Sequence, residues 1–291
     1  MPVLASHHLY TGDIGIVKKL YPNVSKLAEY LLSHINADGV FEQRPETSNH
    51  ANDLAFGTKS THHRSYMNVL LWRTFLDAEF LADAAGMPND AARWRDASER
   101  SWAAVRERFM RKDGLLASSL EDASIGAEAN ALALSLGFFS KTEAEKALAA
   151  LGRISHGKFQ LLLVRGAFAY GMPDEAVRRI REHNWLKAVS PEWKGVHTTS
   201  ECMNHPTRAS WGDEAHPDTA LAGDLTYGIL GVRPLAPGYS HFEFKPGAAN
   251  GIKWAKGVVP TPSGPIHAEW RIENGKLSQR LSAPPNLTQI K

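Results

Sequence analysis

The hydrophobic repeat of the 291-residue chain changes at about Pro237, and this change constrains the fold more than any other feature. Before it, apolar residues recur every three or four positions, as in helices with one buried face. After it, they alternate with polar residues, as in strands. Helices that come first and strands that come last argue against a βαβ sheet. We therefore expect a helical domain over residues 1–235 and a small β domain over residues 236–291.

The helical part divides into segments of ordinary length that are separated by short connections. The predicted helices span residues 13–34, 65–85, 90–110, 125–136, 143–151, 159–170, 174–182 and 217–230. Glycines suited to a left-handed helix end follow many of them, at Gly86, Gly137, Gly152, Gly171 and Gly231. Ser140 and Glu143 have the spacing of a capping box, and Pro173 suits a first helical turn. The pattern predicts stacked helical hairpins.

The C-terminal part has the signals of an antiparallel β domain. Apolar and polar residues alternate over 241–245 and again over 266–273. Asn274-Gly275 then supplies the residues of a two-residue hairpin turn before a strand at 277–281.

Composition excludes several classes of function. Lys and Arg number 33 against 31 Asp and Glu, and the formal charge of +2 gives no reason to expect a nucleic acid or an anionic membrane as partner. Cys202 is the only cysteine, so an intrachain disulfide cannot form. Neither a signal peptide nor a run of about 18 apolar residues stands out, so we expect a cytoplasmic protein, with export left open.

The stretch most suggestive of chemistry lies in the last third of the helical part. T-T-S-E-C-M begins at Thr198 and S-W-G-D-E-A-H-P ends at Pro217. An acid with aromatic walls is what sugar chemistry requires, because an indole stacks on the apolar face of a pyranose. Neither a ligand set with metal-site spacing nor a nucleotide-binding or nucleophile motif is present, so we expect no metal. The candidate residues are Glu201, Trp193, Trp211 and His216.

Three segments support a resemblance to a known family. They are L-Y-T-G-D with K-L-Y-P-N-V over 9–24, A-E-F-L-A-D-A-A-G ending at Gly86, and T-T-S-E through A-H-P to G-I-L-G-V-R-P-L-A-P-G-Y-S-H-F-E-F-K-P at Pro246. In these segments the chain resembles the C-terminal part of the α-L-rhamnosidases of glycoside hydrolase family 78. The resemblance implies a mainly α fold, an incomplete (α/α)6 toroid followed by an antiparallel β-sandwich. It also implies a rhamnose-containing glycan or glycoside as substrate, with no cofactor.

The resemblance also implies roles for individual residues. Glu201 matches the general base of these inverting enzymes, His216 matches a sugar-contacting histidine, and Asp53 falls where the family lines the sugar pocket. The pattern departs from the family at three places. Leu54 stands where the family has a tryptophan, Ser200 replaces the tryptophan before the glutamate, and Trp211-Gly-Asp213 replaces His-x-Trp. These changes indicate an altered sugar contact shell.

Each assignment has a plainer alternative that the sequence leaves open. Glu201 could be a solvated loop carboxylate, Trp193 and Trp211 could pack in the core, and His216 could serve only the start of a helix. Two other functions also stay open. One is a non-catalytic carbohydrate-binding or scaffold protein, and the other is a six-hairpin enzyme for another terminal sugar or an unsaturated uronate.

The family's general acid precedes the L-Y-T-G-D segment, and here only eight residues precede Leu9. We therefore expect that the acid is not in this chain and that the chain alone is inactive. Glu46, Glu121 and Glu192 could replace it in principle, but each falls in a predicted loop without signs of desolvation. An incomplete ring would also leave apolar hairpin flanks in water, which a homo-oligomer or a complementing N-terminal chain would cover.

Overall fold

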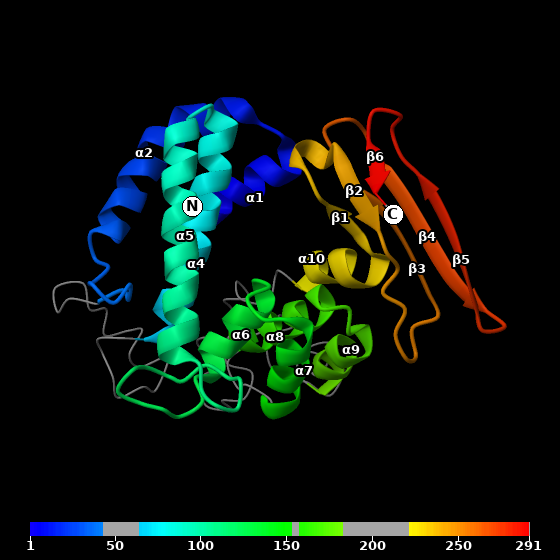
Figure 1. Ribbon diagram of the computed structural model, residues 1–291. Helices are drawn as coiled ribbons and strands as arrows, with labels where there is room; N and C mark the ends of the chain where they lie inside the picture. The colour runs from blue at the N-terminus through cyan, green and yellow to red at the C-terminus, as the bar shows by residue number, and fades with distance from the viewer. Residues whose placement is uncertain (43–63, 153–156, 183–220, 291) are drawn as a thin grey trace, which may run out of the picture. The chain divides into compact units, whose positions relative to one another are not determined.

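The computed structural model describes residues 1–42, 64–152, 157–182 and 221–290. They belong to two compact units, Met1–Ala133 and Leu134–Lys291, and each unit is described by itself. Helices precede strands along the chain, as the change of hydrophobic repeat predicts (Figure 1). The domain boundary after residue 235 stays a prediction.

The helices of the first unit are α1 (Pro2–Thr11), α2 (Ile14–Leu32), α4 (Ser65–Ala85) and α5 (Pro88–Phe109), and α6 (Ala127–Ser135) begins in it. The start of α2 is set locally, because the Asp13 carboxylate accepts a hydrogen bond from the Ile16 N–H at 3.1 Å. Gly12 ends α1 in the left-handed conformation, with φ 68°. Helix α1 was not predicted, because its buried residues, Ala5 and His8, do not form a continuous apolar stripe.

The pair α4 and α5 forms the central hairpin of this unit, and the two helices lie side by side in Figure 1. Gly86 ends α4 with φ 80°, and the Met87 N–H donates to the Ala82 carbonyl at 2.9 Å. Pro88 then starts α5, where the missing N–H costs nothing. The predicted glycine and proline signals at this turn are confirmed.

An aromatic stack and a short polar relay join α2 to this hairpin. Phe75 of α4 stacks on Trp94 of α5, with ring centroids 6.2 Å apart. The Trp94 indole N–H donates to the Tyr21 hydroxyl at 3.3 Å, and that hydroxyl donates to the Asp90 carboxylate at 2.7 Å. Burial and the Asp90 carboxylate raise the pKa of Tyr21 to about 12. Trp102, which belongs to the predicted apolar pattern of this helix, is instead 40% exposed.

Replacing Tyr21 by Phe should lower the free energy of unfolding by about 1 to 2 kcal/mol, because Asp90 and Trp94 both lose their partner. Denaturant unfolding measures the change. Tyr30→Phe is the control, since the Tyr30 side chain is half exposed, and its effect should be within about 0.5 kcal/mol. Equal effects of the two variants would show that the relay does not hold α2 in place.

The second unit contains α7 (Lys141–Ala150), α8 (Gly157–Ala169), α9 (Pro173–Glu182), α10 (Leu221–Leu225) and a π-helical turn, η4 (Thr226–Leu230). The capping box at Ser140 is confirmed, because its side chain accepts from the Glu143 N–H and the Glu143 carboxylate accepts from the Ser140 N–H. Pro173 is the first residue of α9. Gly137 and Gly171 are left-handed, with φ 75° and 73°.

Gly152 does not have the left-handed conformation that the sequence predicts. Leu151 caps α7 in an extended conformation, and the Arg179 guanidinium donates to the Leu148 and Leu151 carbonyls at 2.7 and 2.9 Å. It also lies 3.3 Å from the Gly152 carbonyl. A side chain from α9 therefore satisfies the carbonyls that a glycine cap would have served.

Six strands follow, in two three-stranded sheets. The first sheet has the order β1 (Val232–Pro234), β2 (His241–Phe244), β6 (Thr288–Ile290), and the second has the order β3 (Trp254–Val259), β4 (Ile266–Glu273), β5 (Lys276–Ser282). Asn274 and Gly275, with φ 50° and 75°, form the predicted hairpin turn between β4 and β5. The β2–β6 pair is parallel, unlike the other strand pairs in these sheets. Strands β1, β3 and β6 were not predicted from the sequence.

One face of the sheet β3–β4–β5 packs on η4. Ile266, Ala268 and Trp270 of β4 are buried on this face, and the Trp270 indole N–H donates to the Ile229 carbonyl at 2.8 Å. The alternation of β4 places His267, Glu269, Arg271 and Glu273 on the opposite face. This opposite face is called the outer face below.

Apolar side chains are exposed on α1 and α2. Val3 is 84% exposed, and Ile14 and Leu27 are 48% and 42% exposed. No helix among the described residues has the length and apolar character needed to cross a membrane. The predicted covering partner, a second copy of the chain or a complementing chain, stays a prediction.

We predict that the purified chain self-associates in a concentration-dependent way, because association removes these side chains from water. Light scattering at several protein concentrations tests this. The double variant Ile14→Ser and Leu27→Ser should reduce the association, while Lys18→Ser and Lys26→Ser, exposed on the same helix, should not. A monomer at all concentrations would refute the prediction.

Candidate functional site

The five residues predicted to form the sugar site lie outside the described residues. Glu201, Trp193, Trp211 and His216 belong to the segment 183–220, and Asp53 belongs to 43–63. Their roles in a sugar site therefore stay predictions. The structure does show how the described residues hold the ends of both segments.

Asn68 fixes both ends of the segment that contains Asp53. The side chain is 2% exposed, and its carbonyl oxygen accepts a hydrogen bond from the Phe41 N–H at 2.8 Å. Its amide group donates to the Arg64 carbonyl at 2.9 Å. Phe41 and Arg64 are close to the two ends of 43–63, so the chain leaves and returns at the first turn of α4.

A second buried asparagine orders the neighbouring loop. Asn130 of α6 exchanges hydrogen bonds with the backbone of Leu116, at 2.9 Å in both directions, and donates to the Gly126 carbonyl at 2.8 Å. This loop pairs with the start of α4 through a bridge between Arg64 and Ser119. The two asparagines thus build one polar framework at this end of the first unit.

Two adjacent acidic residues, Glu121 and Asp122, lie in this loop. The Asp122 carboxylate accepts from the Ser124 N–H at 2.9 Å, which caps a local turn. Glu121 is exposed, as expected for a carboxylate without the surroundings of a general acid. Among the described residues, His, Cys, Asp and Glu side chains do not gather in groups of three or more that could hold a metal ion.

Two titratable residues at this framework escaped the sequence analysis. Burial raises the pKa of Tyr66, and the charge of Glu128 raises it further. Tyr66 lies in the first turn of α4 and Glu128 in the first turn of α6. Neither residue belongs to a recognisable motif, and they are far apart in the sequence. Tyr66 follows the segment of Asp53 closely in the chain and is an additional candidate for a polar contact with a ligand.

A partly buried ion pair holds the helix that follows the segment of Glu201. The Arg165 Nε of α8 lies 2.8 Å from an Asp224 carboxylate oxygen of α10. The Asp224 side chain is only 7% exposed, and burial raises its pKa although Arg165 opposes the shift. α10 is therefore tied to α8 just after the chain returns from 183–220.

This pair generates a pH prediction. The pKa of Asp224 is higher in the folded chain than its ordinary value of 3.8. The contribution of Asp224 to the free energy of unfolding is therefore full below pH 3.8 and is lost as pH rises through the folded-state pKa. Asp224→Asn should therefore gain stability relative to the wild type between about pH 3 and pH 7. Arg165→Gln leaves a buried carboxylate unpaired and should lose about 2 to 3 kcal/mol at neutral pH. Urea unfolding at both pH values measures these differences, and a constant difference for Asp224→Asn would contradict the argument.

Comparison with known proteins identifies the family. The family model for the bacterial alpha-L-rhamnosidase 6 hairpin glycosidase domain matches residues 2–161. The model for the bacterial alpha-L-rhamnosidase C-terminal domain matches residues 231–290. An alpha-L-rhamnosidase of Formosa agariphila is 32% identical over 95 residues, which are 33% of this chain and 9% of that protein.

Solved structures show the same fold. The family GH78 rhamnosidase of Bacillus sp. GL1 has a TM-score of 0.73 at 17% identity, covering 99% of this chain and 33% of its own. The Streptomyces avermitilis alpha-L-rhamnosidase complexed with L-rhamnose has a TM-score of 0.69 at 18% identity, covering 97% and 28%. The chain thus spans about a third of the length of these enzymes and has the fold of that part, an incomplete six-hairpin toroid with a β-sandwich. The chain belongs to the bacterial α-L-rhamnosidases, with their six-hairpin glycosidase domain followed by their C-terminal domain.

Proposed function

We propose that this chain is the C-terminal portion of the catalytic region of an α-L-rhamnosidase-type glycoside hydrolase that recognises a terminal α-L-rhamnosyl or similar deoxyhexosyl residue. The observation that carries this proposal is the position of T-T-S-E and A-H-P. Both motifs lie between the two stretches that the rhamnosidase family models match, at 2–161 and 231–290.

In the proposed mechanism Glu201 is the general base. An inverting glycosidase uses one carboxylate to activate water against the anomeric carbon, while an acid about 6.5 to 9.5 Å away protonates the leaving oxygen. Trp193 and Trp211 would stack on the sugar ring, and His216 and Asp53 would contact its hydroxyls. The partly buried pair Arg165–Asp224 supports this arrangement by fixing the helix that follows the segment of Glu201.

We further propose that the general acid is not among these 291 residues and is supplied by a complementing chain or segment. A positioned acid contributes typically about 10² to 10⁴ in rate, so these residues alone would bind the sugar without appreciable turnover. A non-catalytic carbohydrate-binding role is the second candidate. The substitutions at Ser200 and Leu54, which alter the family's aromatic shell, favour a sugar other than rhamnose as a further alternative.

The chain should bind L-rhamnose but should not hydrolyse an aryl α-L-rhamnoside at an appreciable rate. Calorimetric titration and release of the aryl group measure the two activities. Turnover that Glu201→Gln abolishes would show that a second carboxylate among these residues completes the site. If the chain does not bind L-rhamnose but binds L-fucose or an unsaturated uronate, the result would support another six-hairpin activity.

Glu201→Gln should reduce sugar binding and change the free energy of unfolding by less than about 0.5 kcal/mol, as expected for a solvated loop carboxylate. Glu99→Gln is the control, because Glu99 is an exposed glutamate of α5. The control should leave both properties unchanged. A loss of stability well beyond about 2 kcal/mol at Glu201 would identify it as a buried structural partner instead.

A further inference from the structure

The outer face of the sheet β3–β4–β5 brings an exposed indole and several charges together. The strand register aligns Trp254 with Arg271 and Ser278, and it aligns Lys256 with Glu269 and Arg280. Directly opposed residues of neighbouring strands project from the same face of a sheet. The two rows therefore form one continuous polar surface.

Trp254 differs from the other tryptophan of this sheet. Trp270, on the inner face, is fully buried and makes a hydrogen bond through its indole N–H. Trp254 is 60% exposed on β3. Its packing therefore does not explain why a large aromatic side chain occupies an outer-face position, whereas an indole in water offers a flat surface on which a sugar ring can stack.

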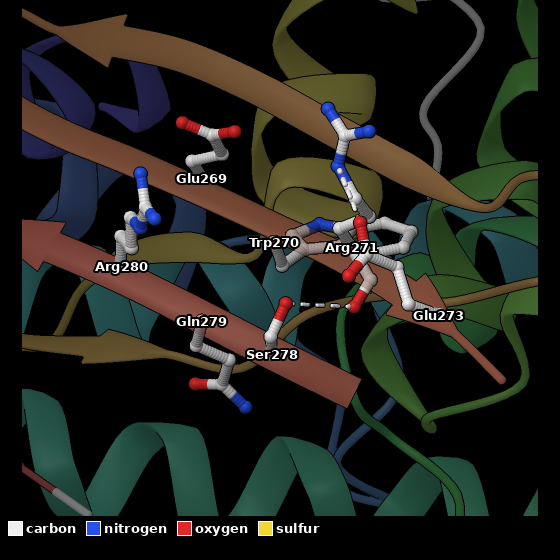
Figure 2. Close-up of a pocket in the computed structure, with 7 residues that line it drawn as sticks. All are labelled: Glu269, Trp270, Arg271, Glu273, Ser278, Gln279 and Arg280. Atoms are coloured by element: carbon white, nitrogen blue, oxygen red, sulfur yellow. Dashed lines mark hydrogen bonds and ion pairs between the residues drawn. The ribbon is translucent and has the colours of Figure 1, made fainter. Parts of the chain in front are cut away.

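The sheet has two hollows, and Arg271, the register partner of Trp254, lines one of them. One hollow of about 250 Å³ is lined by residues that include Glu269, Arg271 and Arg280, and Figure 2 shows these three side chains on the same side of the sheet. A second hollow, of about 280 Å³, is lined in part by Lys256, Glu269 and Arg280. Because Glu269 and Arg280 line both, the two hollows adjoin.

The charged side chains that line these hollows form only long ion pairs with one another. The Lys256 ammonium lies 3.8 Å from the Glu269 carboxylate, and the Arg271 guanidinium lies 3.7 Å from the Glu273 carboxylate. Arg280 has no ion-pair partner within the described part of the chain. Exposed pairs of this length contribute little to stability, so a ligand could replace either partner at small cost.

We propose that this outer face is a carbohydrate-binding site for an acidic oligosaccharide. The Trp254 indole stacks on one sugar ring, and the Arg280 guanidinium pairs with a uronate carboxylate in the two-pronged geometry that arginine favours. Glu269 accepts hydrogen bonds from sugar hydroxyls, and Lys256 adds a second cation for the next acidic sugar.

The mixture of charges favours this ligand over a nucleic acid. Three cations, Lys256, Arg271 and Arg280, attract an anionic chain, but Glu269 and Glu273 lie among them and repel closely spaced phosphates. Sugar hydroxyls, in contrast, donate hydrogen bonds to such carboxylates. The site uses none of the residues assigned to rhamnoside hydrolysis, so the two proposals can fail separately.

Isothermal titration of the full chain with tetragalacturonate tests the proposal. We expect a dissociation constant below about 1 mM that rises with ionic strength. Cellotetraose, a neutral chain of the same length, should bind at least about fivefold more weakly, and oligouridylate should not compete. Glu201→Gln should bind tetragalacturonate as the wild type does, because it alters only the proposed hydrolytic site.

Two variants locate the site, each with a matched control. Trp254→Ala and Arg280→Gln should each weaken tetragalacturonate binding by about fivefold to tenfold. Trp102→Ala and Arg100→Gln remove an exposed tryptophan and an exposed arginine from α5 and should leave binding unchanged. Thermal unfolding of each variant should match the wild type, because both altered side chains of the site are exposed.

Three results would overturn the proposal. The first is no binding of tetragalacturonate by the wild-type chain. The second is binding that survives both Trp254→Ala and Arg280→Gln. The third is equal or tighter binding of cellotetraose or oligouridylate, which would assign the face to a neutral glycan or to a nucleic acid.

Discussion

The second unit depends on a close approach of backbones that only glycine permits. A Cβ atom at Gly231, which has φ 85°, would overlap the Lys245 carbonyl, and one at Gly247 would overlap the Gly228 carbonyl. These contacts let the turn η4 meet the strand segment that follows β2. The Trp270 indole N–H donates a hydrogen bond to the Ile229 carbonyl, and the sheet β3–β4–β5 thereby packs against η4. The packing of η4 against the segment after β2 therefore requires the glycines of the G-I-L-G-V-R-P motif.

Signals that act within one turn of the chain were predictable from the sequence. Gly86, the capping box at Ser140 and the Asn274-Gly275 turn all have the expected conformations, because each is decided by neighbouring residues. Gly152 was mispredicted because Arg179, remote in sequence, caps α7 instead. The short strands β1 and β6 have three residues each, too few for an alternating pattern to be recognised.

The candidate site is predicted only through the resemblance, and its residues lie outside the described part of the chain. Periodicity indicates a loop around Glu201, but it gives no reason to prefer this carboxylate to Glu121. The described residues add how the site is held: Asn68 fixes both ends of the segment of Asp53, and the pair Arg165–Asp224 fixes the helix after the segment of Glu201. Buried polar groups of this kind need all their partners, so they specify the arrangement of the described residues that flank these segments.

The most direct test of the proposed rhamnose site is a crystal structure of the chain grown with L-rhamnose. The account predicts one sugar ring with the Glu201 carboxylate and the His216 imidazole on the same cavity wall, both within hydrogen-bonding reach of the ring or of a water beside it. Rhamnose bound elsewhere, with Glu201 and His216 on opposite sides of the helical domain, would contradict it.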